Sequence, residues 1–216
     1  MSRWLQNVLP ILAVVTALLI LSITQREPES TSLEVVGAVF LDPPHPLDPF
    51  LLVDQHGTAL DRSRLEGRWT LLFFGYTHCS SACSTILTAL AAAQEQLAVD
   101  EEGSEELQGI FISVDPERDT PEVISQYLDS LHATCTGVVG EPTALAGLAD
   151  QFGVMWPAKL NQVEGDYPIQ LDKTIFVIDP DANWIASILP PLDTPRIVEA
   201  VREIRNGEGN IDAGSK

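Results

Sequence analysis

The chain has few basic residues and few cysteines. Its 216 residues include 12 Lys and Arg against 31 Asp and Glu, which gives a formal net charge of −19. A nucleic-acid-binding protein needs a concentrated basic surface to contact the phosphate backbone, so this composition argues against nucleic acid as a partner. Three cysteines are too few for a small scaffold held together by disulfides. The sequence also shows no internal repeats.

Apolar residues make up 45% of the chain, enough to fill a globular core. The longest apolar run, Val8 to Ile23, carries no charge, and Trp4 and Leu5 extend it toward the N-terminus. Its length lies between that of a short transmembrane helix and that of the apolar part of a secretory signal peptide. Because no convincing Ala-x-Ala cleavage site follows, we expect residues 1–26 to form an uncleaved membrane anchor, with a removed signal segment as the alternative.

The composition changes after the apolar run. Residues 27–49 are rich in proline, serine, threonine and acidic residues, which predicts a flexible linker that holds a domain away from a membrane. His45 lies in this stretch, and we interpret it as solvated. We expect one globular domain over residues 50–206 and a flexible tail over residues 207–216.

The globular part alternates buried strands with helices. We expect strands at residues 50–54, 69–75, 107–114, 173–178 and 184–189, and helices at 84–99, 120–131, 141–152 and 194–206, the last one ending at Gly207. This order predicts an α/β fold, a mixed sheet flanked by helices on both faces. A thioredoxin-like arrangement fits it.

The chemistry is expected where the strand at 69–75 ends. Cys79 and Cys83 follow it, four residues apart. If Cys79 lies at or just before a helix N-terminus, both sulfurs lie on one side of the first turn, within reach of a disulfide or of one shared ion. The helix dipole favours the thiolate, which both metal binding and nucleophilic attack require. The alternative is that both cysteines are buried and act as small apolar side chains.

Three stretches of the chain carry a family resemblance. They are Phe50–Gly57 (FLLVDQHG), Gly67–Cys83 (GRWTLLFFGYTHCSSAC) and Ser113–Pro121 (SVDPERDTP). Together they resemble the Sco-type copper chaperones, the SCO/SenC family, and the resemblance extends from about Phe50 to Arg205.

The resemblance implies a thioredoxin-like domain held at a membrane by an N-terminal helix. It implies copper binding through Cys79 and Cys83 together with one distant histidine, and a role in assembling the dinuclear copper centre of cytochrome c oxidase. The implied partners are the copper-bearing subunit of that oxidase and a copper donor or a thiol-disulfide redox partner. Members of the family face the periplasm or the mitochondrial intermembrane space, and here we expect the bacterial inner membrane, with the domain in the periplasm.

The chain departs from the family pattern at several positions. Ser80, Ser81 and Ser84 replace the Pro, Asp and Pro that the family usually has around the second cysteine. The position of the distant histidine is Leu171, and Gln170 replaces the Asp before it. Two thiolates alone can hold Cu(I), whereas Cu(II) prefers a field that includes nitrogen or oxygen donors. We therefore expect the replacement to weaken Cu(II) binding more than Cu(I) binding.

Two histidines are candidates for a substitute nitrogen ligand. His78 is the better of the two because it adjoins Cys79, although a neighbour in sequence often points away. We interpret His132 as a helix-end residue that offsets the helix dipole.

Other marked residues have structural interpretations. In the loop after the strand at 107–114, we expect Asp115 or Asp119 to cap the following helix and Arg118 to orient the loop. The alternative is a docking surface near the cysteines. We expect Cys135 to be a buried small residue, and adventitious pairing with Cys79 or Cys83 is left open.

Three functional hypotheses follow. In the first, Cys79 and Cys83 take up Cu(I) and pass it on by ligand exchange. In the second, one thiolate attacks a target disulfide and the other resolves the mixed disulfide, as in the family members that are regarded as thiol-disulfide reductases. In the third, the chain senses copper or redox state and transfers nothing.

Overall fold

The computed structural model of the chain describes residues 34–35, 37–79, 81–100, 106–154 and 173–211. The membrane anchor expected at residues 1–26 lies outside this part of the chain. Among the described residues, no helix has both the length and the apolar character that a membrane span requires.

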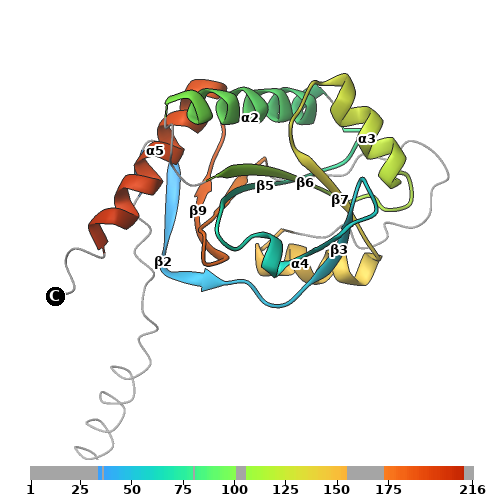
Figure 1. Ribbon diagram of the computed structural model, residues 1–216, viewed down its shortest axis with the longest axis horizontal. Helices are drawn as coiled ribbons and strands as arrows, with labels where there is room; N and C mark the ends of the chain where they lie inside the picture. Colours follow the sequence, from blue (N-terminus) through green and yellow to red (C-terminus); the bar gives the residue numbers. More distant parts are fainter. Residues whose placement is uncertain (1–33, 36, 80, 101–105, 155–172, 212–216) are drawn as a thin grey trace, which may run out of the picture. The chain divides into compact units, whose positions relative to one another are not determined.

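The described residues include nine strands that form a single mixed sheet, in the order β1-β2-β9-β8-β5-β6-β7-β3-β4 (Figure 1). Strands β5, β6 and β7 are parallel, and β8 and β9 run antiparallel to their neighbours. The strands are β1 Glu34–Val35, β2 Ala38–Pro46, β3 Leu51–Asp54, β4 Ala59–Asp61, β5 Trp69–Gly75, β6 Leu107–Ser113, β7 Thr136–Val139, β8 Ile175–Ile178 and β9 Asn183–Ile188.

Helices cover both faces of the sheet. They are α2 Ser81–Asp100, α3 Pro121–Ser130, α4 Pro142–Gln151 and α5 Thr194–Ile211, with a short 3-10 helix at Arg62–Arg64. Figure 1 shows α2 and α5 on one side of the sheet and α4 on the other. This confirms the expected mixed sheet flanked by helices on both faces.

The central strand β5 contributes side chains to the apolar core on both faces of the sheet. All seven of its residues are buried. Leu71 and Phe73 belong to the core cluster formed with α2, α3 and α5, whereas Leu72 and Phe74 belong to the cluster formed with α4. A strand buried on both faces has a continuous apolar run rather than an alternating one, as the sequence of β5 has.

The sheet begins earlier in the chain than the sequence predicted. Strand β2 lies inside the segment expected to be a flexible linker, and it pairs antiparallel with β9, with Ala38 opposite Ile188 and Phe40 opposite Ala186. The prediction of a flexible linker therefore does not hold over residues 38–46. The proline-rich and acidic composition masked a short apolar run, from Ala38 to Leu41, that has a strand partner far along the chain.

Two further differences concern short or terminal elements. Strand β7 was not predicted, and it lies between β6 and β3 in the sheet. Helix α5 continues through Gly207, so the predicted end of the helix at that residue was wrong. Gly207 is not among the described glycines with a positive φ angle, which is the conformation that makes glycine a helix terminator.

The register of the two central parallel strands positions the functional loops. Gly75 at the end of β5 pairs with Ser113 at the end of β6. The loops that leave the carboxyl ends of adjacent parallel strands meet at the same edge of the sheet. The loop containing Cys79 and the loop containing Asp119 are therefore neighbours.

Candidate functional site

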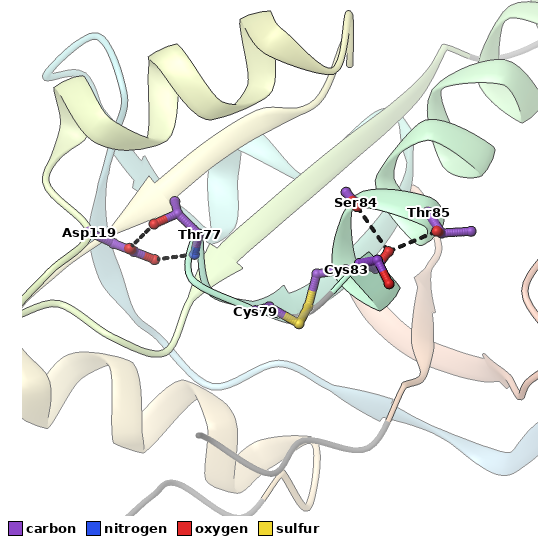
Figure 2. Close-up of a disulfide and its surroundings, with 7 residues drawn as sticks. Thr77, Cys79, Cys83, Ser84, Thr85 and Asp119 are labelled. Atoms are coloured by element: carbon purple, nitrogen blue, oxygen red, sulfur yellow. Dashed lines mark hydrogen bonds between the residues drawn. A yellow bond between two sulfur atoms is a disulfide. The ribbon is translucent and has the colours of Figure 1, made fainter. Parts of the chain in front are cut away.

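The two cysteines of the CxxxC motif are joined in the structure. Cys79 lies in the loop after β5, Cys83 lies in the first turn of α2, and the two form a disulfide with their Cα atoms 5.9 Å apart (Figure 2). Cys79 precedes the first residue of α2 by two positions. This confirms the expectation that Cys79 lies just before a helix N-terminus and that the four-residue spacing brings the sulfurs together.

The two sulfurs differ in exposure. Cys83 is 3% exposed and belongs to the apolar cluster under α2, whereas Cys79 is only partly buried and contacts both apolar clusters. A partly exposed thiol at a helix N-terminus meets the conditions for a reactive thiolate. Cys79 is therefore the sulfur that an incoming partner reaches first.

Backbone hydrogen bonds hold the loop before Cys79. The Cys79 N–H donates to the Tyr76 carbonyl oxygen at 3.1 Å, which closes a turn over residues 76–79. The Val114 N–H donates to the Gly75 carbonyl oxygen at 2.9 Å and joins this loop to the one after β6. Tyr76 is 5% exposed, so the loop begins from a buried side chain.

The carboxylate of Asp119 lies beneath this loop. It is fully buried and accepts three hydrogen bonds, from the Thr77 N–H at 2.9 Å, from Thr77 Oγ1 at 2.5 Å and from Ser113 Oγ at 2.6 Å. Figure 2 shows Asp119 directed toward Thr77. Hydrogen bonds to a charged group contribute about 1.5 to 3 kcal/mol each, so this contact is a strong link between the two loops.

The predicted capping role of the aspartates was wrong. The residue that caps α3 is Thr120, whose side-chain oxygen accepts from the Val123 N–H at 3.3 Å. A threonine directly before a proline at the first helical position is a favourable cap, so no aspartate is needed there. Asp119 faces the cysteine loop instead.

Asp115 and Arg118 form the second polar contact in this region. Arg118 Nε donates to Asp115 Oδ2, and both side chains lie largely out of solvent. The Arg118 guanidinium also lies 5.8 Å from the centre of the Tyr76 ring, within range of a cation–π contact. Arg118 therefore contacts both loops, as expected of a loop-orienting residue.

Asp119 also affects the pKa of Tyr127 in helix α3. Burial raises the pKa of the Tyr127 hydroxyl, and the negative charge of Asp119 raises this pKa further. Both causes favour the neutral phenol. Tyr127 therefore remains protonated beside the buried carboxylate at neutral pH.

His78 lies on the outer side of this network. Its Nδ1 is 3.1 Å from Thr77 Oγ1 and 3.9 Å from Asp119 Oδ1, and its side chain is 50% exposed. Because Thr77 Oγ1 donates its only hydrogen to Asp119, it can only accept from His78, so the hydrogen of this contact is on Nδ1.

The described residues do not include a preformed metal site with three or more ligands. Among them, no group of three or more His, Cys, Asp or Glu side chains is arranged to hold a metal ion. His78 precedes Cys79 in the chain, but it does not form a three-ligand group with the two cysteines. His132 is exposed at the end of α3, with a φ angle of 52°. Gln170 and Leu171 lie outside the described residues.

The third cysteine is separate from the pair. Cys135 is free and 5% exposed, and its sulfur lies 3.8 Å from Gln94 Oε1. Burial raises the pKa of this thiol to about 12. The expectation of a buried small residue is confirmed, and Cys79 and Cys83 pair with each other rather than with Cys135.

Sequence reasoning did not single out Thr77 and Ser113, which bind Asp119. Their signal was weak, because each is a single polar residue, Ser113 at the end of β6 and Thr77 two residues after the end of β5. The contact joins residues 42 positions apart, and only the register of β5 with β6 brings them together.

The sequence of this chain is similar to those of known proteins. The family model described as SCO1/SenC matches residues 42–206. A putative copper-binding protein of Stutzerimonas stutzeri is 32% identical over 158 residues, which cover 73% of this chain and 76% of that protein. The mitochondrial SCO1 homolog 1 of Arabidopsis thaliana is 30% identical over 73% of this chain, and the match covers 46% of that protein, a little under half of its length.

Solved structures show the same fold. Copper-bound ScoI of Bradyrhizobium japonicum matches with a TM-score of 0.63 at 31% identity, over 73% of this chain and 98% of that one. Apo Sco1 of Thermus thermophilus matches with a TM-score of 0.65 at 31% identity, over 81% of this chain and 95% of that one. The mixed sheet with its flanking helices is thioredoxin-like, as expected. The chain belongs to the SCO1/SenC family.

Proposed function

We propose that this chain is a copper chaperone that carries Cu(I) on Cys79 and Cys83 and serves the assembly of the copper centre of cytochrome c oxidase. The observation that carries the proposal is the position of the two sulfurs, joined across the start of α2 at a Cα separation of 5.9 Å. Two-electron reduction of this disulfide yields two thiols that can both reach one ion.

Ligand chemistry favours Cu(I) as the cargo. Thiolates are soft ligands that suit Cu(I), and two of them suffice for an ion that tolerates low coordination. Position just before the α2 N-terminus favours ionisation of Cys79. Cu(II) would need harder donors, and Leu171 stands where the family has a histidine.

Relatives support copper as the cargo. The Bradyrhizobium japonicum and Arabidopsis thaliana ScoI structures are described as copper-bound, and the Stutzerimonas stutzeri relative is named a putative copper-binding protein. The proposed target is the copper-bearing subunit of the oxidase, with delivery by ligand exchange between the two cysteines and the target's own ligands.

The proposed location is the bacterial inner membrane, with the domain in the periplasm. The uncharged run from Val8 to Ile23 supports an N-terminal anchor. The SCO1/SenC family membership supports an extracytoplasmic site of action.

A second candidate function is thiol-disulfide reduction of a target protein. The closed disulfide and the absence of the distant histidine favour it. In this reaction the Cys79 thiolate attacks a target disulfide and releases one target thiolate. The Cys83 thiolate then attacks Cys79 in the mixed disulfide, which releases the second target thiolate and closes the Cys79–Cys83 bond.

One titration separates the two functions. The full chain in detergent, reduced and free of metal, is titrated anaerobically with Cu(I) against a competing chelator while the accessible thiols are counted. Tight binding of one ion that protects two thiols supports the copper carrier. Failure to compete for Cu(I), with a disulfide that equilibrates readily in glutathione buffer, contradicts the carrier and supports the reductase.

A further inference from the structure

The buried carboxylate of Asp119 is not one of the proposed copper ligands. It is hydrogen-bonded to the cysteine loop, although it has no role in capping α3. Thr120 caps the helix, so Asp119 is not needed there. Its three donors are the N–H and hydroxyl of Thr77, in the loop after β5, and the hydroxyl of Ser113, the last residue of β6. Burying a carboxylate is costly unless it is well hydrogen-bonded, and two of its three hydrogen bonds come from Thr77, in the loop of the reactive cysteine.

We infer that Asp119 is a positioning residue for the cysteine pair and acts through Thr77. Thr77 precedes Cys79 by two residues, and both its N–H and its hydroxyl donate to the carboxylate. Residues 76–79 form one closed turn, so fixing Thr77 fixes the start of the Cys79 backbone. The expected effect on copper binding rests on the proposed function of the pair, whereas the expected effect on the disulfide does not.

The role matters most when the disulfide is open. In the oxidised chain the covalent bond keeps the sulfurs together. In the reduced chain, the Asp119–Thr77 bonds keep the Cys79 loop close to Cys83, which lies on the rigid helix α2. A preorganised pair binds Cu(I) more tightly and closes its disulfide more readily, because less conformational freedom is lost in either event.

The network also orders His78. Thr77 Oγ1 accepts from the His78 Nδ1–H because its own hydrogen goes to Asp119. The chain Ser113, Asp119, Thr77, His78 thus extends from a buried strand end to the half-exposed residue beside Cys79. Removing the carboxylate therefore loosens Thr77 and His78, the two residues that precede Cys79.

The test compares three variants with the wild-type chain. Asp119→Ala removes all three acceptor contacts, Thr77→Val removes only the hydroxyl, and Asp119→Asn keeps one acceptor oxygen. The matched control is Asp179→Ala, because Asp179 is also buried and also accepts three hydrogen bonds, from the Asp181 N–H and from the backbone and side chain of Asn183. Asp179 follows β8, whose end pairs with the start of β5, at the opposite end of that strand from Cys79.

Two properties of the pair are measured in the full chain in detergent. The first is the equilibrium between the dithiol plus glutathione disulfide and the protein disulfide plus two glutathione molecules. The second is the Cu(I) dissociation constant under anaerobic conditions. Unfolding by urea is followed in parallel to separate stability from positioning.

The expected result for Asp119→Ala is a 10- to 100-fold weaker Cu(I) affinity, roughly the range seen when partners of metal ligands are removed. The equilibrium constant for disulfide formation falls in the same direction. Thr77→Val gives a smaller shift of the same sign, and Asp119→Asn retains part of the wild-type behaviour. Asp179→Ala lowers stability but leaves both constants within about twofold of wild type.

A double variant checks that Asp119 acts through Thr77. If it does, Asp119→Ala combined with Thr77→Val is no worse than Asp119→Ala alone, because both changes remove one shared contact. Fully additive shifts overturn this route.

The outcomes distinguish the inference from the proposed function. If the wild-type chain does not bind Cu(I) but Asp119→Ala still disfavours the disulfide relative to Asp179→Ala, the positioning role holds and the copper function fails. If the wild-type chain binds Cu(I) tightly and a folded Asp119→Ala variant matches it in both constants, the positioning role is overturned and the copper function stands.

Discussion

Cys79 and Cys135 both contact the apolar cluster under helix α2, but they lie in opposite chemical environments. Cys79 is partly exposed, lies before a helix N-terminus and has Cys83 as a bonded partner. Cys135 lies just before β7, is nearly inaccessible and has a pKa raised by burial to about 12. Thiol reactivity in this chain therefore comes from the loop-to-helix junction after β5, and not from the presence of a thiol near the core.

Removing a thiol from the pair is expected to have the largest effect. Cys79→Ser or Cys83→Ser leaves a single soft ligand, so Cu(I) affinity falls by at least about a hundredfold, beyond the loss caused by disturbing a ligand's partners. The measurement is competition with a Cu(I) chelator. Cys135→Ala is the control and retains wild-type affinity; a comparable loss in that variant would show that the comparison of environments is mistaken.

Alkylation tests the same comparison without metal. After reduction, the partly exposed Cys79 reacts first with iodoacetamide at pH 8 in the folded chain, whereas Cys135 reacts only after unfolding. A pKa of about 12 against the ordinary 9.0 means that the Cys135 thiolate fraction is about a thousandfold smaller. Mass spectrometry of the alkylated chain identifies the modified residues. Rapid alkylation of Cys135 in folded protein contradicts its buried state.

The sequence predicted the environment of Cys79 better than that of Cys135. The spacing of Cys79 and Cys83 after an apolar strand was enough to predict their place before a helix, because strand, loop and helix are all local. The interpretation of Cys135 rested only on the absence of a partner. Its depth comes from tertiary packing, since Gln94 in α2 and Gly109 in β6 lie against its sulfur.

The supporting residues of the site could not be predicted from the sequence. Asp119 was interpreted as a helix cap, since aspartate before a helix commonly serves that role. Thr120 takes that role, and Asp119 binds a threonine in another loop. The contact depends on the register between β5 and β6, which local patterns do not encode. Strand β2 was missed for a related reason, because its partner β9 lies far along the chain.

Packing around Cys135 is expected to be intolerant of added volume. A Cβ atom at Gly109 would lie 2.9 Å from Cys135 Sγ and 2.7 Å from Leu90 Cδ2, so Gly109→Ala forces neighbouring atoms to move. We expect a loss of about 1 to 3 kcal/mol in the free energy of unfolding, measured with urea.

Gly147 offers a matched control for that substitution. It lies in α4, and apart from its chain neighbours and the backbone of its own helix nothing lies within 4 Å of its Cβ position. Gly147→Ala should stabilise the chain by about 0.5 to 1 kcal/mol, because alanine favours the helix. If Gly109→Ala is equally stabilising, the region around Cys135 is not closely packed.

Restoring the family's histidine is expected to have the smallest effect on Cu(I) affinity. It should change Cu(II) affinity more, and so separate the binding of the two oxidation states. Leu171→His supplies a nitrogen donor, so Cu(II) affinity should rise about tenfold while Cu(I) affinity changes less. Cu(II) titration followed by electron paramagnetic resonance measures it. Unchanged Cu(II) affinity in a folded variant would mean that residue 171 does not correspond to the family's copper histidine.

X-ray absorption at the copper edge, on the full chain loaded with one equivalent of Cu(I) after reduction, tests most directly whether Cys79 and Cys83 hold the copper. We expect a copper environment dominated by two sulfur neighbours, lost in Cys79→Ser and unchanged in Cys135→Ala. An environment of nitrogen and oxygen neighbours, or a sulfur signal that survives in Cys79→Ser and disappears in Cys135→Ala, would contradict the assignment of the Cys79–Cys83 pair as the copper-carrying site.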